Sequence, residues 1–140
     1  MTDETTQREA MLDLAARAEA ASGADRELDA AIAPLQGLRI VDEGHPIGRM
    51  CYDDIGCAHL LPRFTASLDA AMTLVPEGPS ATGERFSVEH WDASGVHASH
   101  VRASAWVSGA PRVYAATPAL ALTAAALRAR AAIRGDSNAD

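Results

Sequence analysis

The side chains best suited to chemistry in this 140-residue chain are its histidines, because imidazole exchanges a proton near neutral pH. Three of the five fall between residues 90 and 100: His90, His97 and His100. With Glu89 or Asp92 beside them, they make a metal site conceivable, since zinc accepts imidazole and carboxylate ligands. Their spacing matches no recognised zinc motif, so exposed polar positions on a hairpin are the simpler interpretation. No catalytic or metal-ligating residue is assigned.

The two cysteines suggest a second cluster. Cys51, Cys57 and His59 are spaced C-x5-C-x-H, beside Asp53 and Asp54. Structural zinc sites place about two to four residues between paired cysteines and use a second pair of ligands. A nucleophilic cysteine needs a base oriented toward it, and the sequence indicates none. We therefore expect free thiols in a reducing compartment. No phosphate-binding glycine loop or hydrolase motif is present, and no cofactor is expected.

The charged residues limit the kinds of ligand or partner that the chain is expected to bind. All twelve basic residues are arginine, against nineteen acidic residues, which gives a net charge of −7 and argues against general nucleic-acid binding. A high-GC genome is the simpler explanation for the missing lysine. Arginine also binds phosphate through two parallel hydrogen bonds, and tryptophan stacks on bases. The candidate ligand-binding residues are Arg63, Arg85, Arg102, Arg112, Trp91 and Trp106.

The elements that must position these side chains follow from hydrophobic spacing, capping residues and turns. Helices are predicted over residues 4–21, over 26–35 after an Asp25 cap, and over 66–74 after Thr65 or Ser67. In the third helix the residues expected to face inward are Leu68, Ala71, Met72 and Val75. Strands are predicted at 38–41, 85–91, 101–107 and 112–115. Residues 42–62 are predicted to form one long loop, either an ordinary surface loop or a contact surface.

The closing helix has the clearest signals. Thr117 suits the N-cap, Pro118 suits the first helical position, and Gly135 is expected to end the helix after Arg134. Its apolar residues form two neighbouring stripes, so we expect burial on two sides, against a sheet and against a helix or a second subunit. Trp106 falls on the face of its strand opposite the apolar one, where helices cover it or a partner meets it.

These elements predict an α+β fold. An antiparallel sheet of three to four strands would be packed against helices, with a long C-terminal helix. The chain is expected to be one domain, with a helical extension through residue 24, a core over 25–134 and a frayed tail over 135–140. The start of the chain is no secretory signal, and no apolar run approaches the ~20 residues of a membrane span. A reducing cytoplasm is therefore the expected location.

Three segments together resemble the phage ABA-sandwich domain family, small proteins of bacteriophages and prophages. They are EAASGADRELDAAIA (19–33), PRFTASLDAAMTLVPEG (62–78) and ATPALALTAAALRARA (116–131). Phe64 stands where the family usually has tyrosine, and residues 42–61 match no family pattern. The resemblance implies a sheet between two helical layers, an α/β/α sandwich. It supplies no catalytic motif.

The sequence thus favours an accessory protein that binds a small ligand or a host partner without catalysis. One version sequesters a nucleotide signal of host defence. A structural or regulatory interaction module, using residues 42–61 as its contact surface, is the alternative, and a metal-dependent hydrolase is a third. We expect no membrane partner. We expect the chain to form a homo-oligomer.

Overall fold

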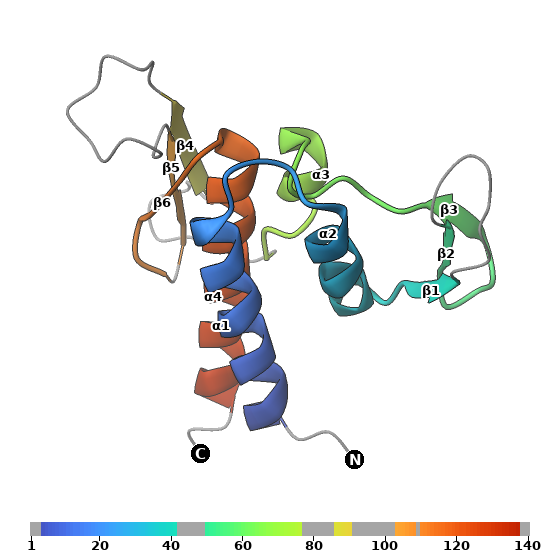
Figure 1. The fold of residues 1–140 in the computed structure, drawn as a ribbon. Coiled ribbons are helices and arrows are strands. Elements are labelled where there is room, and N and C mark those ends of the chain that lie inside the picture. The colour runs from blue at the N-terminus through green and yellow to red at the C-terminus, as the bar shows by residue number, and fades with distance from the viewer. Residues whose placement is uncertain (1–3, 42–49, 77–85, 91–102, 109, 138–140) are drawn as a thin grey trace.

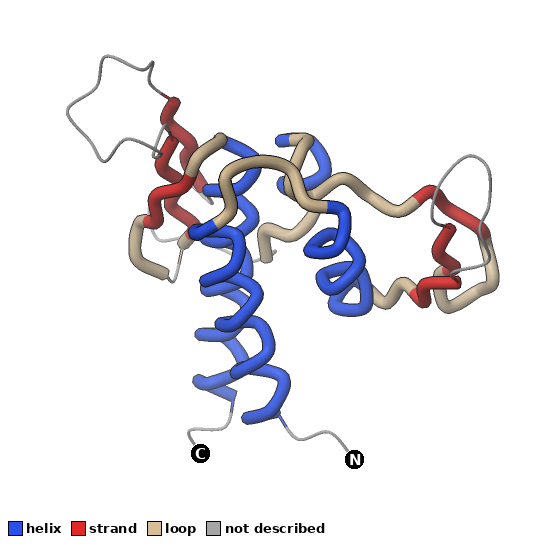
Figure 2. The backbone as a smooth tube through the Cα atoms, in the orientation of Figure 1, coloured by secondary structure: helices blue, strands red, loops and turns tan. Residues whose placement is uncertain are grey.

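The computed structural model describes residues 4–41, 50–76, 86–90, 103–108 and 110–137. These form an α+β fold with four α-helices, one 3-10 helix and two three-stranded antiparallel sheets. Figure 1 shows α1 (Glu4–Ala20) and α4 (Pro118–Ser137) side by side and antiparallel, so both chain termini lie at one end. Figure 2 shows the two sheets on opposite sides of the helices.

Helix α4 begins where its capping residues predict. The Leu120 N–H donates to Thr117 Oγ1 over 3.2 Å, and Pro118 is the first helical residue. The predicted stop at Gly135 is wrong, because the helix continues to Ser137. Glycine weakens a helix by only about 1 kcal/mol relative to alanine, which a well-packed helix tolerates.

Helix α4 is the centre of the core. It packs against α1, against α3 and against the sheet formed by β4 (Phe86–His90), β5 (Ala103–Val107) and β6 (Val113–Ala115). Every residue from Ala119 to Leu127 is buried, which confirms burial on two sides. Most of these residues are alanine, and small side chains let the neighbouring backbones approach closely.

The predicted strands form this sheet, but buried and exposed positions alternate only in β6, and Ser104 within β5 is as buried as its neighbours. Ala103, Ala105 and Val107 are buried toward the core, and β5 pairs with β4 on one side and β6 on the other. Helix α1 lies on α4, to which it presents the buried Leu14, and contributes to the core. The described residues therefore stack as sheet, α4 and α1, with a helix in the middle. The helical layer expected on the sheet's other face is not among them.

The next helix along the chain after α1 is short and changes type near its end. Helix α2 spans Arg26–Ile32 after the Asp25 N-cap, and it tightens into a 3-10 turn over Ala33–Gln36. The predicted helix over 26–35 thus changes type near its end, because Pro34 has no N–H to donate. Gly37 ends this turn in the left-handed conformation, with φ +76°.

Helix α3 is shorter than predicted, and only part of its predicted inward face is buried. It spans only Leu68–Met72, with Ser67 as the N-cap. Ala71 and Val75 are buried as expected, but Leu68 and Met72, also expected to face inward, are 39% and 42% exposed, whereas Leu74 beyond the helix is fully buried. One helical turn has no second turn to align its apolar positions, so the residue that follows it enters the core instead.

The second sheet corrects the prediction of a single long loop over 42–62. It consists of β1 (Arg39–Val41), β2 (Met50–Tyr52) and β3 (Ala58–Leu60) in that order. Strands of three residues are too short to show an alternating pattern, which is why the sequence concealed two of them. Figure 1 shows this sheet standing apart from the α1–α4 pair.

A buried hydrogen-bond network joins the segments that carry the family resemblance. The Asp29 carboxylate accepts from the Thr65 N–H at 2.8 Å and the Thr65 hydroxyl at 2.9 Å. Arg26 donates to Asp29 and to the carbonyl oxygens of Leu61 and Pro62. The Thr123 hydroxyl donates to the Phe64 carbonyl at 2.9 Å, which ties α4 to the same segment.

Candidate functional site

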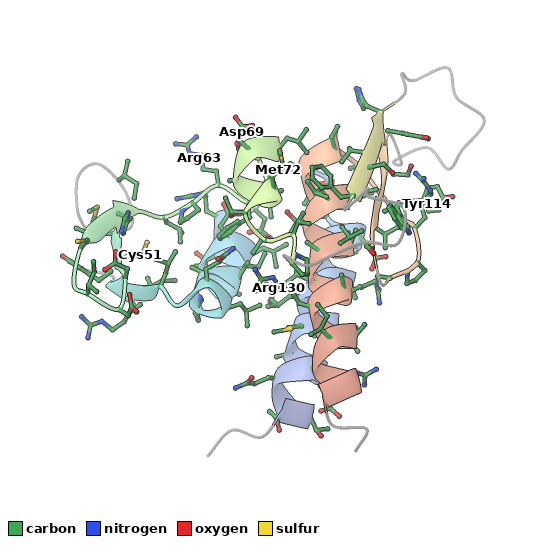
Figure 3. All side chains as sticks on the ribbon, turned by 180° about the vertical axis from the view of Figure 1, so that it is seen from behind. Cys51, Arg63, Asp69, Met72, Tyr114 and Arg130 are labelled. Carbon is green, nitrogen blue, oxygen red and sulfur yellow. The ribbon has the colours of Figure 1, made fainter. Side chains whose placement is uncertain are left out.

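The structure separates the predicted ligand-binding residues. Arg85, Trp91 and Arg102 lie outside the described residues. Arg63 is exposed in the turn before α3. Trp106 and Arg112 belong to the β4–β5–β6 sheet, and Figure 3 shows this sheet, marked by Tyr114, on the other side of α4 from Arg63. Arg63 therefore does not join the other two.

Strand alternation assembles a second set of side chains around Trp106 and Arg112. Because Ala103, Ala105 and Val107 face the core, Ser104 and Trp106 point to the opposite face of the sheet. The cross-strand register pairs Ser104 with Glu89 and Tyr114, and Trp106 with Ser87. Arg112 lies two residues before Tyr114, on the same face. We call this surface the outer face; it consists of Ser87, Glu89, Ser104, Trp106, Arg112 and Tyr114.

Only one nitrogen of the Arg112 guanidinium, Nη1, contacts its neighbours among the described residues. Its Nη1 donates to Ser104 Oγ at 3.0 Å and lies 3.9 Å from Glu89 Oε2. Ser104 is buried, whereas Glu89 is exposed, so the serine fixes the geometry and the loose surface ion pair adds little. Within the described part of the chain, Nε and Nη2 of Arg112 have no hydrogen-bond partner. This is the edge with which arginine grips a phosphate or carboxylate through two parallel bonds.

Two aromatic side chains lie on the same face of the sheet as this arginine. Tyr114 is 48% exposed and Trp106 is partly buried. Aromatic faces on a sheet surface stack on ligand rings and tolerate many ring types. The outer face thus combines an anion-binding edge, two ring surfaces and one carboxylate within three adjacent strands. Sequence reasoning found Trp106 and Arg112 but missed Ser104 and Tyr114, although the alternation that turned Trp106 outward also turns Ser104 outward.

The histidine cluster is only partly described. His90 is exposed at the end of β4 and pairs in register with Ala103. His97, His100 and Asp92 lie outside the described residues. In the ranges that the structure covers, no three histidine, cysteine, aspartate or glutamate side chains gather as metal ligands would.

The cysteine cluster forms a hairpin turn. Cys51 is a buried free thiol and Cys57 an exposed one. Asp53 accepts the N–H groups of Cys57 at 2.8 Å and Ile55 at 3.1 Å, and its other oxygen lies 2.9 Å from His59 Nε2. The His59 hydrogen bond, followed by the Cys57 N–H, lowers the pKa of Asp53. Burial, with a smaller effect of Asp53, raises the pKa of the Cys51 thiol. These hydrogen bonds show that Asp53 stabilises the turn between β2 and β3.

A pocket of about 370 Å³ opens where α3 and α4 begin. Its lining combines small apolar residues with two threonines: Ala24, Thr65, Ala66, Leu68, Thr117, Pro118 and Ala119. Both threonine hydroxyls already serve the fold, one in the Asp29 network and one as the cap of α4. The pocket therefore offers mainly apolar surface.

Comparison of the chain with known proteins finds no matching family model, curated protein or solved structure. Among the described helices, none combines the length and apolar character required to cross a bilayer.

Proposed function

We propose that this chain is a non-catalytic accessory protein that binds a small nucleotide-like ligand on the outer face. The observation that carries the proposal is the Nε–Nη2 edge of Arg112, which has no hydrogen-bond partner among the described residues and lies on the same face of the sheet as Trp106 and Tyr114. Phosphate and a flat ring are the two chemistries that such a surface recognises together.

The remaining groups fit the same ligand class. Glu89 is a hydrogen-bond acceptor within reach of a ribose hydroxyl or an exocyclic amino group of a ligand seated against Arg112. A net charge of −7 disfavours long polyanions, whose binding needs many cations. A ligand with one or two phosphates requires only one well-placed arginine.

The resemblance to the phage ABA-sandwich family supplies the biological setting of the proposal. A phage or prophage protein of this kind would sequester a nucleotide signal of host defence in the bacterial cytoplasm. In the segments that resemble the family, the polar side chains of Asp29, Thr65 and Thr123 form hydrogen bonds within the fold and so stabilise the scaffold. The outer face lies largely outside those segments, so its ligand preference belongs to this chain.

The proposal is tested by thermal shift and calorimetry with a cyclic mononucleotide, a cyclic dinucleotide and ADP-ribose. Ribose 5-phosphate and the free nucleoside separate the phosphate contribution from the ring contribution. We expect Arg112→Gln to weaken binding by about tenfold or more, since a charge-assisted hydrogen bond contributes about 1.5–3 kcal/mol. Tyr114→Ala should weaken ligands that carry a ring and leave ribose 5-phosphate unaffected.

The control is Arg39→Gln, which removes an exposed arginine from β1, on the other sheet. It should bind as the wild type does. The proposal fails if no member of the panel shifts the unfolding temperature, or if Arg112→Gln and Arg39→Gln bind equally.

A protein-interaction role has one specific observation in its favour. Ile55, in the turn between β2 and β3, is 79% exposed, and Leu60, on β3, is 55% exposed. Exposed apolar side chains often mark contact surfaces. A pull-down with wild-type chain and with the Ile55→Asp/Leu60→Asp variant tests it. A host protein retained equally by both chains contradicts this surface.

A further inference from the structure

Two exposed charges of opposite sign lie beside α3 without partners. Arg63 and Asp69 are both exposed, and among the described residues neither side chain has a hydrogen-bond or ion-pair partner. Leu68, which precedes Asp69 at the start of α3, forms an exposed apolar pair with Met72 one helical turn further on. Figure 3 shows Arg63, Asp69 and Met72 together at this end of the molecule.

This pair continues into the pocket at the start of α4. Leu68 is both a member of the exposed pair and part of the lining, next to Ala66, Pro118 and Ala119. We call Arg63, Leu68, Asp69, Met72 and this pocket the α3 patch. The patch has an apolar centre with a concavity, and it has one cation and one anion at its edge.

We propose that the α3 patch is the interface through which two copies of this chain form a two-fold dimer. A two-fold contact brings the same patch together twice, so the patch must be complementary to itself. Arg63 and Asp69 meet that condition, because Arg63 of one copy faces Asp69 of the other and the pair is repeated across the axis. Leu68 and Met72 of each copy are then covered by the apolar surface of the other.

A second copy fits better than an unrelated protein for one reason. A partner of single charge would satisfy either Arg63 or Asp69 and repel the other, whereas a second copy of the chain carries a complement for each. The α3 patch lies across α4 from the outer face, so the dimer leaves the proposed ligand surface open, and this inference does not depend on the proposed function.

The patch is small, so the dimer is expected to be concentration dependent. Sedimentation equilibrium or light scattering of the full chain over a concentration series should show the mass rising from monomer toward dimer. Arg63→Asp and Asp69→Arg each place like charges across both repeated contacts, and each should weaken the dimer by about tenfold or more. Arg39→Asp, which reverses an exposed charge on the other sheet, should leave the dimer unchanged.

A mixture of the two variant chains provides the decisive test of the two-fold contact. An equimolar mixture of the Arg63→Asp chain and the Asp69→Arg chain should form a heterodimer, because each supplies the complement that the other lacks. The chain with both substitutions should dimerise again on its own. Circular dichroism confirms that each variant is folded, as expected for exposed positions. A wild type that stays monomeric throughout the series, single reversals that leave the dimer intact, or a mixture that does not associate would each overturn the proposal.

Discussion

Asp29 is the residue that holds the chain's separate parts in register. It is fully buried, and its carboxylate accepts three hydrogen bonds, two from Thr65 and one from Arg26 at 2.8 Å. Arg26 reaches on to the Leu61 and Pro62 carbonyls. Helix α2 thereby fixes the segment that connects β3 to α3, and the position of the α3 patch follows from it.

Removing this carboxylate should be costly. Asp29→Ala leaves the Thr65 N–H and hydroxyl buried without their acceptor, and we expect a loss of about 2–4 kcal/mol in the free energy of unfolding. Urea unfolding followed by circular dichroism measures it. Thr65→Ser keeps the hydroxyl and should cost under about 1.5 kcal/mol; equal losses for the two variants would contradict the role assigned to the carboxylate.

Asp53 gives the β2–β3 hairpin a pH dependence. Hydrogen bonds from His59 and from the Cys57 N–H lower the pKa of Asp53 in the folded chain. A carboxylate with a lowered pKa contributes stability that is fully present above its ordinary unfolded pKa and is lost as the pH falls through the lowered value. The protection of the Ile55 and Cys57 amides, measured against their intrinsic exchange rates at each pH, should therefore fall in that acid range. In Asp53→Asn this pH-dependent loss of protection should be absent, and its persistence would contradict the assignment.

At the scale of elements, α4 depends on small residues. Ala125 is fully buried in the core between its neighbours, whereas Ala132 on the same helix is only partly buried. Enlarging Ala125 to leucine forces packed side chains apart, and we expect a destabilisation of about 1–3 kcal/mol. The matched change Ala132→Leu should be close to neutral in the same thermal or urea unfolding experiment. If the two substitutions have equal effects, α4 is not packed as tightly as described.

The elements that sequence predicted well are those with independent signals. Helix α4 has a cap and a long apolar pattern, and β5 alternates over five residues. The strands β2 and β3 have three residues each, and their pairing depends on contacts between distant segments rather than on local pattern. Helix α3 was placed correctly by its Ser67 cap, but the direction of Leu68 is decided by tertiary packing.

The candidate site was predictable to the same extent. Trp106 and Arg112 were selected by residue type, and strand alternation placed Trp106 on the outer face. The register of β5 and β6 brings Arg112 to Ser104. The path of the chain around α2 places Arg63 in another part of the molecule. Neither is encoded in local spacing. Tyr114 was missed because its three-residue strand carries little periodic signal.

At the scale of the whole molecule, stability should be uneven. Helices α1 and α4 pack on each other and on the β4–β5–β6 sheet, whereas the β1–β2–β3 sheet contacts the rest chiefly through the 3-10 turn before β1. Regions with few buried contacts open at lower free energy. Hydrogen exchange should therefore find the α4 and β5 amides most protected and the β3 amides least. Equal protection in both sheets would contradict this division.

The molecule thus combines a helical centre with two surfaces that face away from each other across α4. One is the outer face, with Arg112 and Tyr114, and the other is the α3 patch, with Arg63 and Asp69. Separate surfaces allow ligand binding and self-association to be altered independently by substitution.

The most direct test of the proposed ligand surface is a nitrogen–proton NMR titration of the folded chain with the nucleotide that gives the largest thermal shift. If the ligand binds on the outer face, the Trp106 indole N–H and the amides of Ser104, Arg112 and Tyr114 shift in a saturable way, while the amides of β1 and β3 stay in place. Saturable shifts confined to other parts of the chain, or none at any nucleotide concentration, would contradict it.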